Sequence, residues 1–155
     1  MPKKILLAAA FAAAFSVAAI AGPFDGFKGK IKDGLYEYKM QMDMGQVPGM
    51  PPGMGKQTHT FQNCVSQKDI EEGGFGNSKD RKQPENCEIK NMNMSGNTAT
   101  YTMECKGNPA MKADNKITFT GDGFNMDMKM AMNQGGQVMN MTQRMEGRYI
   151  GPCKK

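Results

Sequence analysis

The chain has 155 residues, with 20 lysines and arginines against 15 aspartates and glutamates, and it has no tryptophan. The net charge of +5 is spread along the sequence, without a basic helix or a basic stripe interleaved with aromatic residues. This distribution gives no support to nucleic-acid binding. The length suits one domain with a modest core.

The first 21 residues, MPKKILLAAAFAAAFSVAAIA, have the pattern of a secretory signal peptide. Two lysines precede a mostly alanine apolar run, and Ala19-Ile20-Ala21 is a small-x-small cleavage site. The alternative is an uncleaved anchor, but the run is marginal for a bilayer about 30 Å thick. We expect cleavage before Gly22, export to the periplasm, one β-rich domain over residues 22–155, and no transmembrane anchor after cleavage.

Residues 35–44, LYEYKMQMDM, form the first predicted strand. Tyrosine and methionine occupy every second position, and charged or amide side chains fill the positions between them. Residues 124–132, FNMDMKMAM, repeat this pattern with phenylalanine and methionine. Such period-2 alternation predicts antiparallel strands with one buried face and one solvated face.

A Pro/Gly-rich loop, GQVPGMPPGMG, occupies residues 45–55. Its prolines exclude ladder pairing, so Met50 and Met54 are expected to be exposed. They suggest a contact site for a partner or a membrane surface, and a loop without a partner explains them equally well. The segment 56–65 then returns as a second strand, and an S-x-x-D pattern directly after it predicts one capped helical turn.

Two turn signals set the register of the last three strands. Gly121-Asp122 predicts a two-residue hairpin turn that places Phe119 opposite Phe124. The sequence NQGG that follows predicts a four-residue loop, which would place Met130 opposite Met139. Both registers bring apolar residues together on one face, as burial of that face requires.

All four cysteines lie after the predicted cleavage site, and an even count in an exported chain predicts two disulfides. A metal site is disfavoured because no C-x-x-C pair is present. The loop Ser95-Gly96-Asn97 sets Cys87 opposite Cys105, and opposed positions have Cβ atoms about 4.5–5.5 Å apart. We therefore predict the bond Cys87–Cys105, which leaves Cys64–Cys153 by default.

In this register Met92 and Met94 fall on the opposite face, unless a bulge near Lys90 turns them inward. With that exception, the apolar positions of the predicted strands share one face. We predict an all-β fold with two disulfides, in which an antiparallel meander of about seven strands forms a small barrel or a curved half-barrel.

The chain resembles a known family through an ordered set of motifs. These motifs are GLYEYKMQMDM, VPGMPPGM, THTFQNCVS, NCEIKNMNMSGNTATYTMECKG, ITFTGDGFNMDMKM and MEGRYIGPCKK. Their order is similar to that of domain of unknown function 3617, a family of small exported bacterial proteins, over residues 33–155. The resemblance implies an exported, periplasmic, β-rich domain, and it transfers no functional residue because the family has no assigned activity.

The sequence gives little support to catalysis. His59 is the only histidine, and it lies in a predicted strand, where a structural role is the simpler interpretation. A cysteine nucleophile is disfavoured because the cysteines are expected to be oxidised. No phosphate loop or dinucleotide-binding motif is present. We therefore expect a protein that is not an enzyme, without catalytic residues and without a required cofactor.

Methionine is the unusual component, because 17 occur in the chain and only Met1 precedes the predicted cleavage site. Thioether sulfur binds Cu(I), so a copper site is one hypothesis. Its candidate ligands are Met128, Met130, Met139 and Met141, with Met42 and His59 as a further pair. The simpler hypothesis is that methionine fills the core, because residues 22–155 contain only nine leucines, isoleucines and valines.

A methionine-lined interior also adapts to irregular ligands. Aromatic residues are expected to line such a site together with the methionines, namely Tyr36, Tyr38, Phe61, Tyr101, Phe119 and Phe124. The expected role is therefore binding of an apolar small molecule, a lipid-like moiety or an envelope protein partner. Cu(I) binding is the first alternative, and a structural or accessory role in the envelope is the second.

Overall fold

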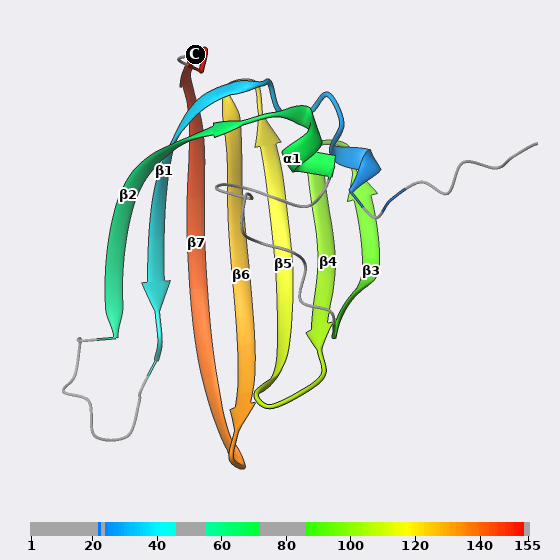
Figure 1. Ribbon diagram of the computed structural model, residues 1–155, viewed down its shortest axis with the longest axis vertical. Coiled ribbons are helices and arrows are strands. Elements are labelled where there is room, and N and C mark those ends of the chain that lie inside the picture. The colour runs from blue at the N-terminus through cyan, green and yellow to red at the C-terminus, as the bar shows by residue number, and fades with distance from the viewer. Residues whose placement is uncertain (1–21, 23, 46–54, 72–85, 154–155) are drawn as a thin grey trace, which may run out of the picture.

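The computed structural model describes residues 22, 24–45, 55–71 and 86–153 (Figure 1). The predicted signal peptide, Met50 and Met54 lie outside the described residues. Neither of the two short helices in the described part is long and apolar enough to cross a membrane.

Seven antiparallel strands form one sheet in the described part of the chain. The strands are β1 (Gly34–Asp43), β2 (Lys56–Val65), β3 (Cys87–Ser95), β4 (Thr98–Cys105), β5 (Ala110–Thr120), β6 (Gly123–Gln134) and β7 (Gln137–Gly151), and the helices are η1 (Asp25–Phe27) and α1 (Gln67–Glu71). The order across the sheet is β2-β1-β7-β6-β5-β4-β3. The all-β prediction is confirmed.

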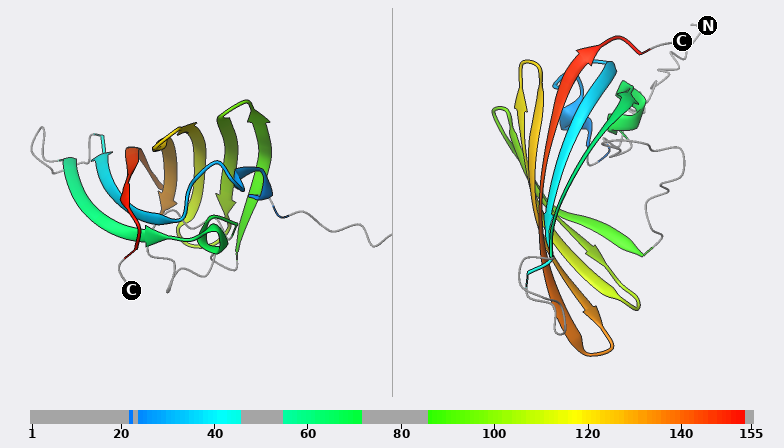
Figure 2. Two further views of the ribbon diagram at one scale, coloured as in Figure 1. Left: turned by 90° about the horizontal axis from the view of Figure 1, so that it is seen from above. Right: turned by 90° about the vertical axis from the view of Figure 1, so that its left-hand side faces the viewer.

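The sheet does not close, so the small barrel among the predicted architectures is wrong and the curved half-barrel is correct. β7 pairs with β1 inside the sheet, but β2 and β3 do not pair with each other, and each is an edge with one neighbouring strand. Figure 2 shows a curved, strongly twisted sheet with β2 and β3 at its two edges. A barrel would instead require these two strands to pair.

One face of the sheet, called the inner face below, packs against η1 and α1. Phe27 from η1 and Ile70 from α1 are fully buried there. The rings of Phe27 and Phe119 lie 5.1 Å apart. The predicted capped helical turn is confirmed by α1, which directly follows Ser66. The Ser66 backbone amide donates a hydrogen bond to Asp69 Oδ2 at 2.9 Å. Both helices lie at the end of the sheet opposite the β6–β7 turn (Figure 1).

The hairpin registers are confirmed at one turn and wrong at the next. Phe119 pairs with Phe124, as the Gly121-Asp122 turn predicts. Met130 pairs with Met141 rather than with Met139. The cause is the turn itself, because Gly135 and Gly136 both have positive φ values, 60° and 84°, and make a two-residue turn instead of a four-residue loop. The shift of two residues keeps every side chain on its predicted face.

Both predicted disulfides are present. Cys87 and Cys105 are opposed in the β3–β4 pair, with Cα atoms 4.0 Å apart. Cys64 and Cys153 are joined with a Cα separation of 5.7 Å.

The three-residue loop predicted at residues 95–97 is wrong, because Ser95 pairs with Thr98 and leaves a two-residue turn.

The alternative considered for this hairpin, a bulge near Lys90, is present in the β3–β4 pair. The register shifts between Lys90 and Asn93, and Asn91 has a φ of 54°. Met92 and Met94 are thereby turned inward, where they pack against the core.

The charged side chains of the strands belong to the outer face, as the alternation and the observed registers require. Arg144 donates to Asp127 and Arg148 donates to Glu37, each at 2.9 Å. At the β3–β4 end of this face, a hydrogen bond from Lys90 to Glu104 raises the pKa of Lys90 and lowers the pKa of Glu104.

Candidate functional site

Six methionines form two parallel rows on the inner face, at the end of the sheet farthest from the helices. In one row, the cross-strand partners run from Met141 through Met130 and Ala113 to Met103. In the next row, they run from Met139 through Met132 and Met111 to Cys105. We call this set the methionine platform: Met103, Met111, Met130, Met132, Met139 and Met141.

All six platform methionines are half-buried. Two other methionines of the same face, Met126 and Met145, are only 6% exposed, and they lie closer to the helices in the core cluster. The inner face therefore contains methionines in two environments. Those near the helices are core residues, and those of the platform retain contact with solvent.

The opposite half of the inner face is aromatic and covered. Across the strands, Phe61 pairs with Tyr38, Tyr38 with Gly147, Gly147 with Phe124, and Phe124 with Phe119. The rings of Tyr38 and Phe61 stack at 5.0 Å, and those of Tyr38 and Phe124 meet edge to face at 6.0 Å. This set packs tightly because Gly147 carries no side chain: a Cβ atom there would lie 2.5 Å from the Phe124 ring.

The predicted ligand-lining aromatic residues thus lie in this covered half rather than around the platform. Five of the six are buried, namely Tyr36, Tyr38, Tyr101, Phe119 and Phe124. Phe61 is 38% exposed at the sheet edge. Their packing against one another and against η1 is typical of a core. Whether they also contact a ligand stays a prediction.

The predicted metal ligands are only partly brought together. Met130 and Met141 are direct cross-strand partners, but Met139 faces Met132 and Met128 faces Gln143. The further pair is not directly opposed either, since the cross-strand partner of His59 is Met40 and that of Met42 is Gln57, which makes His59 and Met42 diagonal neighbours. Within the described residues, no group of three or more His, Cys, Asp or Glu side chains could hold a metal ion.

Sequence reasoning missed three platform residues, Met103, Met111 and Met132. The predicted register of the β6–β7 hairpin is wrong by two residues, so it does not place Met132 opposite Met139. Met103 and Met111 lie in segments with little methionine, and only the β4–β5 and β5–β6 pairings bring them to the platform. The shorter turn at Gly135-Gly136 is the signal that could have identified Met132.

Three amide side chains lie in the next row of the inner face, between the methionine platform and the aromatic half. We call this row the amide row: Gln57, Gln143 and Asn115. Met42 lies between the two glutamines, and Met128 lies between Gln143 and Asn115. Beyond Asn115 the row ends at Tyr101, whose burial raises its pKa to about 12. The row therefore offers neutral hydrogen-bonding groups.

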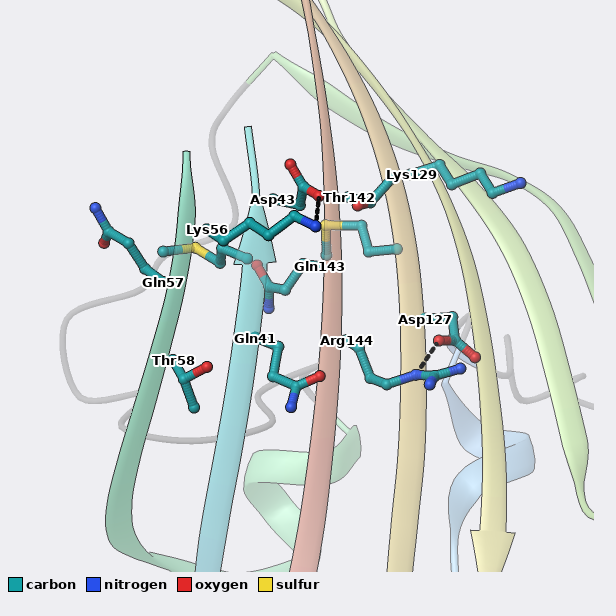
Figure 3. Close-up of a pocket in the computed structure, with 12 residues that line it drawn as sticks. Gln41, Asp43, Lys56, Gln57, Thr58, Asp127, Lys129, Thr142, Gln143 and Arg144 are labelled. Carbon is teal, nitrogen blue, oxygen red and sulfur yellow. Dashed lines mark hydrogen bonds and ion pairs between the residues drawn. The ribbon is translucent and has the colours of Figure 1, made fainter. Parts of the chain in front are cut away.

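A depression of about 410 Å³ crosses β2, β1, β7 and β6. Its charged lining side chains belong to the outer face and are shown in Figure 3. Two ion pairs occupy it, one between Lys56 and Asp43 at 3.7 Å and one between Arg144 and Asp127 at 2.9 Å. Most of the charged side chains that line the depression are therefore already paired with each other. The platform is for this reason the better candidate for a ligand site.

Comparison of the chain with curated proteins and with solved structures found no match. The resemblance seen in the motifs is confirmed at the level of the family. The family model described as "Protein of unknown function (DUF3617)" matches residues 31–153, which is most of the chain, and the protein therefore belongs to that family.

Proposed function

We propose that this protein is a non-enzymatic periplasmic binding protein and that the methionine platform holds an apolar molecule such as a lipid chain. The observation that carries the proposal is the half-buried state of six neighbouring methionines on a sheet face where the described strands place no charged side chain. Contiguous apolar surface of this kind is typical of interaction sites. The predicted signal peptide and the two disulfides support an oxidising, exported location.

The dimensions of the platform suit one extended apolar chain. It spans four neighbouring strands, β7, β6, β5 and β4, which at the usual strand spacing is about 14 Å. Its two rows are about 7 Å apart along the strands. Methionine side chains are flexible and polarisable, so they adapt to a ligand without a fixed shape. Each buried methylene of a ligand would contribute about 0.8 kcal/mol before the cost of association.

A fluorescence titration with diphenylhexatriene, a hydrocarbon probe without polar groups, tests this proposal. We expect saturable binding to the disulfide-intact protein and at least a tenfold loss when Met130, Met132, Met139 and Met141 are all replaced by glutamine. A matched control replaces Val138 and Ile150, which are 62% and 39% exposed on the outer face of β7, by glutamine. Absence of saturable binding, or equal losses in both variants, would contradict the proposal.

The second candidate is Cu(I) binding, favoured by two directly opposed methionine pairs. Met130 faces Met141 and Met132 faces Met139, and opposed residues have Cβ atoms about 4.5–5.5 Å apart. Four thioethers in neighbouring positions suit Cu(I). Replacing the four by leucine separates the candidates, because leucine keeps the apolar surface and removes sulfur. A copper protein would lose competition with a chromophoric Cu(I) chelator in this variant, whereas an apolar site would still bind diphenylhexatriene.

A further inference from the structure

Asn115 is the one member of the amide row that is almost fully buried, with 4% of its surface exposed. Its Nδ2 donates to the Ala113 carbonyl oxygen at 3.1 Å. Ala113 is the residue of β5 that lies between Met130 and Met103 in the platform. This hydrogen bond therefore holds the amide nitrogen of Asn115 toward the platform.

The other polar atom of this side chain, Asn115 Oδ1, has no hydrogen-bond partner in the part of the chain that the structure describes. An unpaired buried acceptor destabilises the native state, and such groups in native proteins usually have a specific reason. Exposed Gln57, by contrast, has a partner in His59, at 3.2 Å. Asn115 Oδ1 is thus an unpaired acceptor in the row beside the platform, and because it is shielded from solvent, a ligand reaches it only by displacing the side chains that cover it.

The strands that the structure describes place no charged side chain on the inner face as a countercharge to a charged ligand. The charged side chains of the seven strands all occupy outer-face positions, namely Glu37, Lys39, Asp43, Lys56, Glu88, Lys90, Glu104, Lys112, Asp114, Lys116, Asp127, Lys129, Arg144, Glu146 and Arg148. Moving an ionised group from water onto an apolar surface without a partner is costly. The chemistry of this face therefore favours a neutral ligand.

We infer that the ligand of the platform is an uncharged amphiphile with a hydrogen-bond donor in its head group. Its apolar chain lies on the platform, and a hydroxyl or amide N–H of the head donates to Asn115 Oδ1. This inference rests on the proposed function, and it specifies the ligand class of the same site. Fatty alcohols, primary fatty amides, monoglycerides and diglycerides are uncharged and have such a donor, whereas fatty-acid anions and alkylammonium ions are charged.

The test compares four ligands with the same ten-carbon chain, namely decanol, decanamide, decanoate and decylammonium, by displacement of diphenylhexatriene at pH 7. We expect decanol and decanamide to bind at least about tenfold more tightly than the two ions. Replacing Asn115 by leucine, which has nearly the same volume, should weaken decanamide binding about tenfold relative to diphenylhexatriene binding in the same variant. The control Asn125→Leu, on the outer face of β6, should change neither.

The outcomes separate the inference from the proposed function. If diphenylhexatriene does not bind, both the proposed function and the inference fail. If it binds but decanoate or decylammonium competes as well as decanamide, the inference is overturned and the apolar site stands. If the Asn115→Leu variant binds decanamide as tightly, relative to diphenylhexatriene, as the unchanged protein does, the inference is also overturned. Should that variant lose its near-ultraviolet circular dichroism, Asn115→Ala provides the same comparison.

Discussion

The two halves of the inner face share the same strands and the same alternation, but they differ in what covers them. In the aromatic half, η1 and α1 pack on rings such as Phe119 and Tyr101. In the platform half, six methionines stay half-buried. The comparison teaches that alternation predicts which face a residue occupies, whereas its burial depends on a second layer of structure. The predictions below test whether the first half is core and the second half is a surface for binding.

Each half of the sheet carries one disulfide, and the two are expected to differ in their effect. Cys64–Cys153, at the aromatic end, closes a loop with a sequence separation of 89, and Cys87–Cys105, beside the platform, closes one of 18. In the chain-entropy model, removal lowers the free energy of unfolding by about 4–5 and about 3 kcal/mol, respectively. Urea unfolding of the two Cys→Ser double variants measures this difference. A larger effect at Cys87–Cys105 would contradict the account.

Removing a large side chain should be costly in the aromatic half and mild on the platform. Phe124 is 2% exposed, so Phe124→Ala should lower the free energy of unfolding by about 3–5 kcal/mol. Met132 is half-buried, and Met132→Ala should lower it by no more than about 1 kcal/mol. Urea unfolding curves of both variants measure the contrast. Equal costs would mean that the platform is part of the core.

Alkaline pH should weaken the aromatic half selectively. Burial raises the pKa of Tyr101 to about 12 from an ordinary value of 10.0, and burial also raises the pKa of Tyr38. Since the unfolded state loses its phenolic protons first, stability is complete below pH 10 and falls as pH rises from about 10 toward 12. For Tyr101 the loss is at most about 2–3 kcal/mol.

Chemical unfolding followed by circular dichroism at pH 8 to 11.5 measures this loss, and Tyr101→Phe should reduce its slope. The platform residues carry no titratable group. Binding of diphenylhexatriene should therefore stay constant up to pH 9. A decrease in binding before any loss of stability would contradict the separation of the two halves.

A further expected effect concerns the close packing of Gly147 in the aromatic half. A Cβ atom there would meet the Phe124 ring at 2.5 Å, so Gly147→Ala should cost about 1–3 kcal/mol of unfolding free energy. Gly121→Ala is the matched control, because nothing lies within 4 Å of a Cβ atom at that position. Thermal unfolding of the two variants compares them, and equal shifts in Tm would argue against this ring packing.

Much of the fold could be predicted because its determinants are local. Gly121-Asp122 set the register of Phe119 and Phe124. The pairing of Cys87 with Cys105 was predicted from a three-residue loop, whereas the turn has two residues and the bulge between Lys90 and Asn93 brings the cysteines opposite each other. The pairing of β1 with β7 had no local signal, since Tyr36 and Tyr149 are distant in sequence. The sequence also has no local signal that β2 and β3 stay unpaired, which is what distinguishes the open sheet from a barrel.

The candidate site was predicted less well than the fold. The sequence indicated that methionines make up the site. The cross-strand partner of Met132, however, depends on the φ values of Gly135 and Gly136, and two neighbouring glycines do not specify these values uniquely. The burial of Asn115 depends on contacts made by other strands. The covering of the aromatic half depends on Phe27 and Ile70, which lie in short helices without a strong periodic pattern.

Methionine oxidation followed by peptide mapping tests the central claim most directly, because it reads each methionine separately. We predict that dilute hydrogen peroxide oxidises the six platform methionines quickly in the free protein and slowly in the presence of saturating decanol. Met126 and Met145, each 6% exposed, should react slowly in both conditions. Equal rates at all eight methionines, or no protection of the platform by decanol, would contradict the division of this face into a core and a binding surface.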